Sequence, residues 1–234
     1  MKKGFKVTLI ILGCILLILG GLAFWQRHNI QVAWSGLTTS PEQLQQNMVD
    51  VKTEVENALT SYNLQGVRDL TVEEEEKLRK GEITLEEAMD LMMPARIVAE
   101  IPEKETVEVV NTVDTSTKEQ QVEAVVAEYV GKMYTLKAKY VALLGSVESE
   151  AKSSFFSLPK EQQNIKGLQK IGGSFIGEAI SLESQCNGEV GALLSELEQE
   201  LKDLEADTSI VATMRKAYEN EKYLKKAYYL SALQ

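Results

Sequence analysis

The chain has 234 residues, of which 44% are hydrophobic and 26% are charged, and these are ordinary values for a globular protein. Its formal net charge is −10, and all 35 acidic residues lie at or beyond Glu42. An acidic surface of this kind repels phosphate backbones, so we expect no nucleic-acid partner.

An uninterrupted apolar run extends from Val7 to Trp25 and contains no charged side chain. Nineteen residues form a helix of about 28 Å, which is close to the thickness of the hydrocarbon core of a bilayer. Short positively charged flanks stay in the cytoplasm, and this run is preceded by Lys2, Lys3 and Lys6. The sequence therefore predicts a cytoplasmic tail over 1–6, a single transmembrane helix over 7–25 and an extracytoplasmic remainder, in the cell membrane.

Three other interpretations of this run stay open. The residues Gly21-Leu22-Ala23 have the spacing of a signal-peptidase cleavage site, although the run continues through Phe24 and Trp25. Cys14 follows Ile11-Leu12-Gly13 and resembles the modified cysteine of a lipoprotein signal. Lys2-Lys3-Gly4-Phe5 resembles the processing site of type IV prepilins, but Leu9 stands where that family has a glutamate.

A small helical region is predicted over 38–94. Ser40 and Pro41 are a helix start, and apolar residues recur at helical spacing as far as about residue 61. Further on, Thr71 with Glu74 and Thr84 with Glu87 are two capping boxes on either side of Gly81. We expect a short helix, a tight turn and a second short helix that ends at Pro94.

This short stretch also resembles the helical SHOCT module, through Gly81, Ile83, Thr84, Glu86 and Glu87. That module usually lies at chain ends, whereas the stretch here is internal. A well-capped helical hairpin explains the same residues without the resemblance.

Residues 95–116 differ from both neighbouring regions. They contain Pro102 and two runs rich in β-branched residues, 97–101 and 106–113. The composition fits either a small β-hairpin or an extended acidic linker.

The region 117–234 is predicted to be a bundle of long antiparallel helices. Apolar residues between Val122 and Ala151 recur every three or four positions, which predicts a helix of about 35 residues. A second stripe, from Leu168 to Leu204, has a mean spacing of 3.6 and predicts an ordinary helix rather than a heptad seam. A third helix starts near Asp207. The fold class is therefore all-α, with one amino-terminal transmembrane helix before the bundle.

Short turns in this bundle would place the third helix beside residues 181–204, where the start of the first helix also lies. The outer parts of the first two helices, 133–156 and 160–180, would then form a bare pair with many apolar side chains. We expect this end to be covered by the amino-terminal helices at 41–61 and 72–93, or by a second copy of the chain.

The sequence carries no recognisable catalytic, cofactor or metal site. Its one histidine, His28, lies at the predicted membrane surface, and Cys186 falls on the second apolar stripe, which favours a buried thiol over an intermolecular disulfide. A possible interaction surface consists of aromatic and cationic residues: Tyr218, Tyr223, Tyr228, Tyr229, Lys222, Lys225, Lys226, Phe155 and Phe175. Alternatively, these lysines oppose the dipole of a helix carboxy terminus.

Residues 218–222 and 225–229, which read YENEK and KKAYY, also resemble the helical outer domains of uncharacterised bacterial single-pass membrane proteins, and that resemblance implies no activity. We expect a membrane-anchored interaction or scaffold protein that binds a protein partner or itself, with no cofactor and no small-molecule ligand. A sensory or regulatory ectodomain that works with a membrane partner is the alternative, followed by an enzyme that acts on the cell wall.

Overall fold

A computed structural model describes residues 39–93 and 117–231, with side chains as far as Tyr228. These residues form α3 (Pro41–Thr60), α4 (Val72–Lys80), α5 (Leu85–Met92), α7 (Lys118–Phe156), the 3-10 turn η1 (Lys160–Gln162), α8 (Ile165–Asp203) and α9 (Ser209–Ser231). No strand occurs among the described residues, so the predicted all-helical class is confirmed for them.

Two sequence predictions fall elsewhere. The proposed transmembrane helix over 7–25 and the hairpin or linker over 95–116 both lie outside the described residues. Within the described ranges, no helix combines the length and the apolar character needed to cross a membrane.

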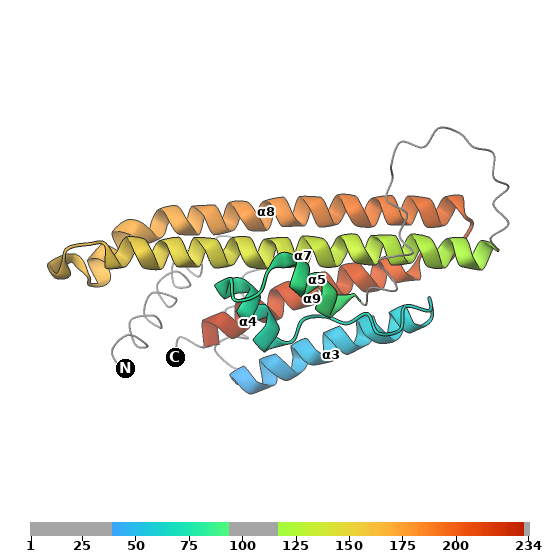
Figure 1. Cartoon of the computed structure of the whole chain (residues 1–234), viewed down its shortest axis with the longest axis horizontal. Helices are drawn as coiled ribbons and strands as arrows, with labels where there is room; N and C mark the ends of the chain where they lie inside the picture. The colour runs from blue at the N-terminus through green and yellow to red at the C-terminus, as the bar shows by residue number, and fades with distance from the viewer. Residues whose placement is uncertain (1–38, 94–116, 232–234) are drawn as a thin grey trace.

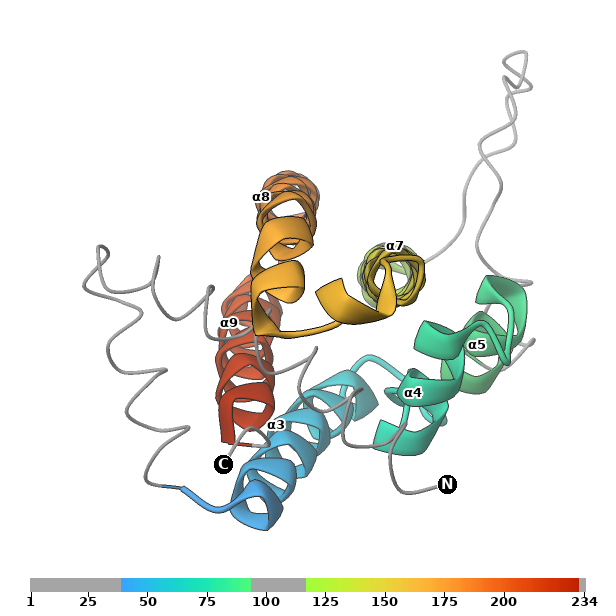
Figure 2. The ribbon, with the colours of Figure 1, turned by 90° about the vertical axis from the view of Figure 1, so that its left-hand side faces the viewer.

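The helices are arranged in two layers (Figures 1 and 2). The long antiparallel pair α7 and α8 forms one layer and runs the full length of the molecule in Figure 1. In the end view of Figure 2, α9 lies below α8, α4 and α5 lie below α7, and α3 lies between these two groups. The turn between α7 and α8 extends past the ends of the other labelled helices.

The three amino-terminal helices, α3, α4 and α5, start where the side-chain caps predicted them to start. Thr71 and Glu74 exchange hydrogen bonds as a capping box, and so do Thr84 and Glu87. Gly81 ends α4 with a φ of 70°, a left-handed conformation that glycine adopts without a steric penalty. Both helices of the predicted short hairpin are thereby confirmed, as is the helix that begins at Pro41.

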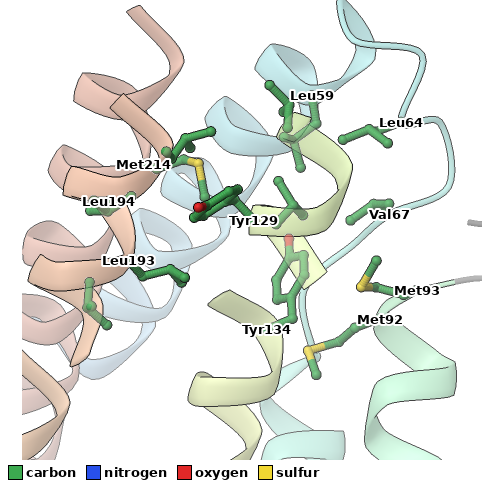
Figure 3. Close-up of a cluster of buried hydrophobic side chains, with 14 of the residues drawn as sticks. Leu59, Leu64, Val67, Met92, Met93, Tyr129, Tyr134, Leu193, Leu194 and Met214 are labelled. Atoms are coloured by element: carbon green, nitrogen blue, oxygen red, sulfur yellow. The ribbon is translucent and has the colours of Figure 1, made fainter. Parts of the chain in front are cut away.

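One hydrophobic core joins the helices on both sides of residues 94–116 (Figure 3). Leu59, Leu64 and Val67 reach it from the amino-terminal part, and Tyr129 reaches it from α7. Leu197 of α8 is completely buried in the same core. The two regions that the sequence separates into 38–94 and 117–234 therefore share their packing.

The amino-terminal helices cover part of the long helix pair. A second face of α7 is buried against α4 and α5, and its members are Val130, Tyr134, Ala138, Val141 and Gly145. At Gly145 the backbone of α4 comes so close that an added Cβ would lie 1.9 Å from the Arg79 carbonyl oxygen. Amino-terminal helices thus cover α7 as far as Gly145 and Glu148, which pairs with Arg79. Beyond Glu148, toward the turn, α7 and α8 extend past the other labelled helices and pack against each other.

The close approach at Gly145 gives a test of this packing. The substitution Gly145→Ala should lower the free energy of unfolding, because the methyl group has no room against the α4 backbone, although alanine is the better helix former. The matched control is Gly173→Ala on α8, where an added Cβ meets nothing within 4 Å. That control should raise the free energy of unfolding by about 0.5–1 kcal/mol. Urea unfolding of the full chain in detergent, followed by circular dichroism, measures both, and an increase for Gly145→Ala would show that α4 does not dock there.

Candidate functional site

Six charged side chains form a buried ion-pair network at the centre of the molecule. Their side chains are only 8–24% exposed, and in the order of their contacts they are Lys52, Asp69, Lys137, Glu221, Lys225 and Glu75. They come from α3, the segment before α4, α7, α9 and α4. Three cations and three carboxylates alternate, so the network has no net charge.

The distances show how closely these groups are paired. Lys137 Nζ contacts Asp69 and lies 2.5 Å from Glu221 Oε1. Lys225 Nζ lies 2.9 Å from both Glu221 Oε1 and Glu75 Oε1. Asp69 Oδ1 also accepts a hydrogen bond from the Leu70 N–H at 2.7 Å. Each group in the network therefore contacts a group of opposite charge.

The electrostatic environment favours the ionised forms of Glu221 and Lys225. Burial alone would raise the pKa of Glu221, but the charges of Lys137 and Lys225 hold it well below its ordinary value. Lys225 responds in the opposite way, since Glu221 and Glu75 outweigh burial and raise its pKa well above the ordinary value. The pKa values of Glu221 and Glu75 are lowered rather than raised as in a general acid, and the arrangement is suited to holding helices together.

Elsewhere in the described chain, the acidic and cysteine side chains do not gather into a metal site. A shallow depression lies between α7 and α8 and is lined by Gln121, Val125, Glu200, Asp203 and Leu204. Glu200 already accepts a hydrogen bond from the Tyr129 hydroxyl at 2.8 Å. The depression is open, and the carboxylate of Glu200 joins the two long helices.

The predicted interaction residues of α9 mostly face the neighbouring helices. Tyr218 donates to Asn187 Oδ1 at 2.7 Å, and Lys222 Nζ lies 3.0 Å from the same oxygen. Lys226 pairs with Glu183 on α8, whereas Lys225 belongs to the ion-pair network. These contacts place four of the predicted residues within the bundle.

The remaining predicted residues divide between two places. Tyr223 and Tyr228 pack on α3 beside Leu44 and Met48, while the side chain of Tyr229 lies outside the described part. Phe155 is buried against Leu168, and Phe175 is half-buried on α8. The structure therefore brings the α9 residues together but does not bring Phe155 or Phe175 to them. Cys186 is half-buried with its Sγ 3.5 Å from the Tyr218 hydroxyl.

A second candidate site lies at the outer end of the long helix pair. We call residues 151–177 the hairpin tip, which includes the end of α7, η1 and the start of α8. Two large apolar side chains are exposed here, Phe156 at 52% and Ile165 at 63%. Ile165 lies in the segment 160–180, which the sequence predicted to carry apolar side chains in need of cover. Phe156 was missed in favour of Phe155, because periodicity does not tell which of two adjacent phenylalanines turns inward.

Hydrogen bonds within the turn hold these apolar side chains outward. Gln163 Nε2 donates to the carbonyl oxygens of Phe156 and Leu158 at 3.0 and 2.8 Å. Asn164 Oδ1 caps α8 by accepting from the N–H groups of Lys166 and Gly167 at 2.9 and 3.2 Å. The ring of Phe156 contacts the buried Phe155 edge-on, with 5.7 Å between centroids. The turn is thus a defined structure with an apolar surface.

The hairpin tip is also where unpaired lysines gather. Of the sixteen lysines in the described ranges, thirteen pair with a carboxylate. The three that have no such partner among the described residues are Lys160, Lys166 and Lys170, and all three are exposed. Residues 151–177 contain four lysines and one glutamate, in a chain whose net charge is −10.

Comparison with known proteins adds no family to this description. No protein-family model matches the chain, and neither a curated protein nor a solved structure is significantly similar to it.

The role of the ion-pair network can be tested by removing one charge. Glu221→Gln leaves a buried excess of positive charge at Lys137 and Lys225, and we expect the free energy of unfolding to fall by about 3–5 kcal/mol. The control is Glu198→Gln, which removes an exposed pair with Lys202 on α8 and should cost less than about 0.5 kcal/mol. Urea unfolding at pH 7 compares the two variants with the unsubstituted chain.

We also expect the destabilisation by Glu221→Gln to depend on pH. The pKa of Glu221 and of Glu75 is lowered in the folded state, so the stability they contribute is complete above their ordinary value of 4.5 and is lost as the pH falls below it. The difference between the unsubstituted chain and Glu221→Gln should therefore shrink between pH 7 and pH 3. A constant difference over this range would show that folding does not lower the pKa of Glu221.

Proposed function

We propose that this chain is a membrane-anchored interaction protein that holds a long helical hairpin on the extracytoplasmic side of the cell membrane. The single observation that supports the proposal most strongly is the hairpin tip, where a well-hydrogen-bonded turn exposes Phe156 and Ile165 beyond the other described helices. Exposed apolar groups on a defined surface usually mark a contact with another molecule.

The rest of the described structure supports this role by fixing the position of the hairpin. The ion-pair network attaches α3, α4 and α9 to α7. Every charged group in the network contacts an opposite charge that also belongs to the network. Tyr140 and Lys139 of α7 also contact Glu189 of α8 at 2.9 Å. A hairpin held in this way can present its tip at a defined distance from Pro41, where α3 begins.

The membrane part of the proposal comes from the apolar run Val7–Trp25 and the lysines that precede it. It is tested by labelling intact, wall-stripped cells with a membrane-impermeant maleimide, in a background where Cys14 and Cys186 are replaced by alanine. We expect Ser149→Cys, at an exposed position of α7, to react at once. Gly4→Cys should react only after the membrane is permeabilised. The reverse pattern would contradict the orientation, and extraction of the protein by alkaline carbonate would contradict a retained anchor.

The interaction part of the proposal is tested in cells with a photoreactive amino acid. Placed at Ser157 in the hairpin tip, it should form covalent adducts with another molecule. Placed at Leu85, which is 41% exposed on α5, it should form few. Equal adduct formation at the two positions, or none at Ser157, would contradict a contact role for the hairpin tip.

A further inference from the structure

The hairpin tip combines exposed apolar side chains with unpaired lysines. Phe156 and Ile165 expose apolar surface at the turn, and Lys160, Lys166 and Lys170 lie in the same segment without a carboxylate partner among the described residues. Everywhere else in the described chain, lysines are neutralised by Asp or Glu. A surface that keeps its lysines unpaired is suited to an anionic partner.

The chemistry of this surface matches the interface of an anionic bilayer. Aromatic and branched apolar side chains insert into the boundary between headgroups and acyl chains, while lysines contact the phosphates of anionic lipids. Two copies of the chain that met tip to tip would bring the same three exposed lysines together on both sides of the contact, and these like charges repel. Charge complementarity therefore favours an anionic lipid surface over a contact between two tips.

The geometry of the chain allows the hairpin tip and the proposed anchor to meet the same membrane. In Figure 1 the start of α3, the end of α9 and the hairpin tip all point toward the same end of the molecule. Leu44 near the start of α3 packs on Leu224 of α9, and Lys226 of α9 pairs with Glu183 of α8. The start of α3 therefore lies near the level of Glu183.

The distance from the level of Glu183 to the hairpin tip can be compared with the length of chain between the proposed anchor and α3. From Glu183 to Ile165 is 18 residues of α8, or about 27 Å along the hairpin. Residues 26–40 join the proposed anchor to α3, and fifteen residues can span at most about 50 Å. The segment is long enough for the hairpin tip to touch the bilayer in which the anchor would lie.

We infer that the hairpin tip, through Phe156, Ile165 and the three unpaired lysines, binds the outer surface of an anionic phospholipid bilayer. This inference rests on the proposed function, because it names the partner of the hairpin. The long helix pair then acts as a support with its turn on the membrane and its other end directed away from it.

The test uses the full chain reconstituted in vesicles of phosphatidylglycerol and phosphatidylcholine, with a photoreactive amino acid at Ser157. The control position is Glu119, at the opposite end of α7 and about 57 Å from Ser157 along the helix. We expect lipid adducts, identified by mass spectrometry, at Ser157 and not at Glu119. Their yield should fall by about threefold or more in vesicles of phosphatidylcholine alone, since each lysine near an anionic surface contributes to binding.

A charge-reversed variant distinguishes lipid binding by the hairpin tip from membrane attachment by the proposed anchor. Lys160→Glu, Lys166→Glu and Lys170→Glu together should lower the lipid adducts at Ser157 to a similar extent, while the circular dichroism spectrum stays unchanged because these side chains are exposed. Adducts with a second copy of the chain instead of lipid would overturn the inference but leave the proposed interaction role standing. Equal lipid labelling at Ser157 and Glu119, or no lipid labelling at either, would overturn it as well.

Discussion

A charged group is stable inside a protein when an opposite charge lies beside it, and the centre of this molecule contains six such groups in one continuous arrangement. Lys137 of α7 contacts both Asp69 and Glu221, and Lys225 of α9 contacts both Glu221 and Glu75. If one of these elements leaves, at least one of the remaining charges loses a contact with an opposite charge. The positions of α4 and α9 on α7 are therefore mutually dependent.

This dependence explains why the two ends of the long helix pair differ. The network and the shared core hold α3, α4, α5 and α9 against one half of the pair, as far as the contact between Arg79 and Gly145. In the other half, Phe155 and Leu168 form a small core of their own and the turn closes through Gln163 and Asn164. One half of the hairpin binds the other described helices, and the other half exposes the hairpin tip.

Local signals in the sequence were sufficient to predict the helices. The capping boxes at Thr71 and Thr84, the left-handed Gly81 and the apolar stripes of α7 and α8 all act over a few residues, and the structure confirms them. The expected cover by amino-terminal helices was right for α7 up to Glu148 only. It did not extend to the hairpin tip, because α3 packs on α9 instead.

The ion-pair network was not predictable from one sequence. Lys137, Glu221 and Asp69 are each ordinary charged residues in their local context, and their contacts join positions 68 and 84 residues apart. Lys225 stood among lysines and tyrosines that were interpreted as a surface, yet its ammonium group lies in the ion-pair network. The unpaired lysines of the hairpin tip were also missed, since only the folded structure shows which lysines have a carboxylate nearby.

The central claim is that the hairpin stands with its turn on the membrane, and a distance measurement tests it most directly. Energy transfer from a donor dye at Ser157 or at Glu119 to acceptor-labelled lipid headgroups would be compared in vesicles that contain the full chain. The two positions are about 57 Å apart along α7, so the account predicts efficient transfer from Ser157 and little from Glu119. Equal transfer from both positions, or stronger transfer from Glu119, would contradict it.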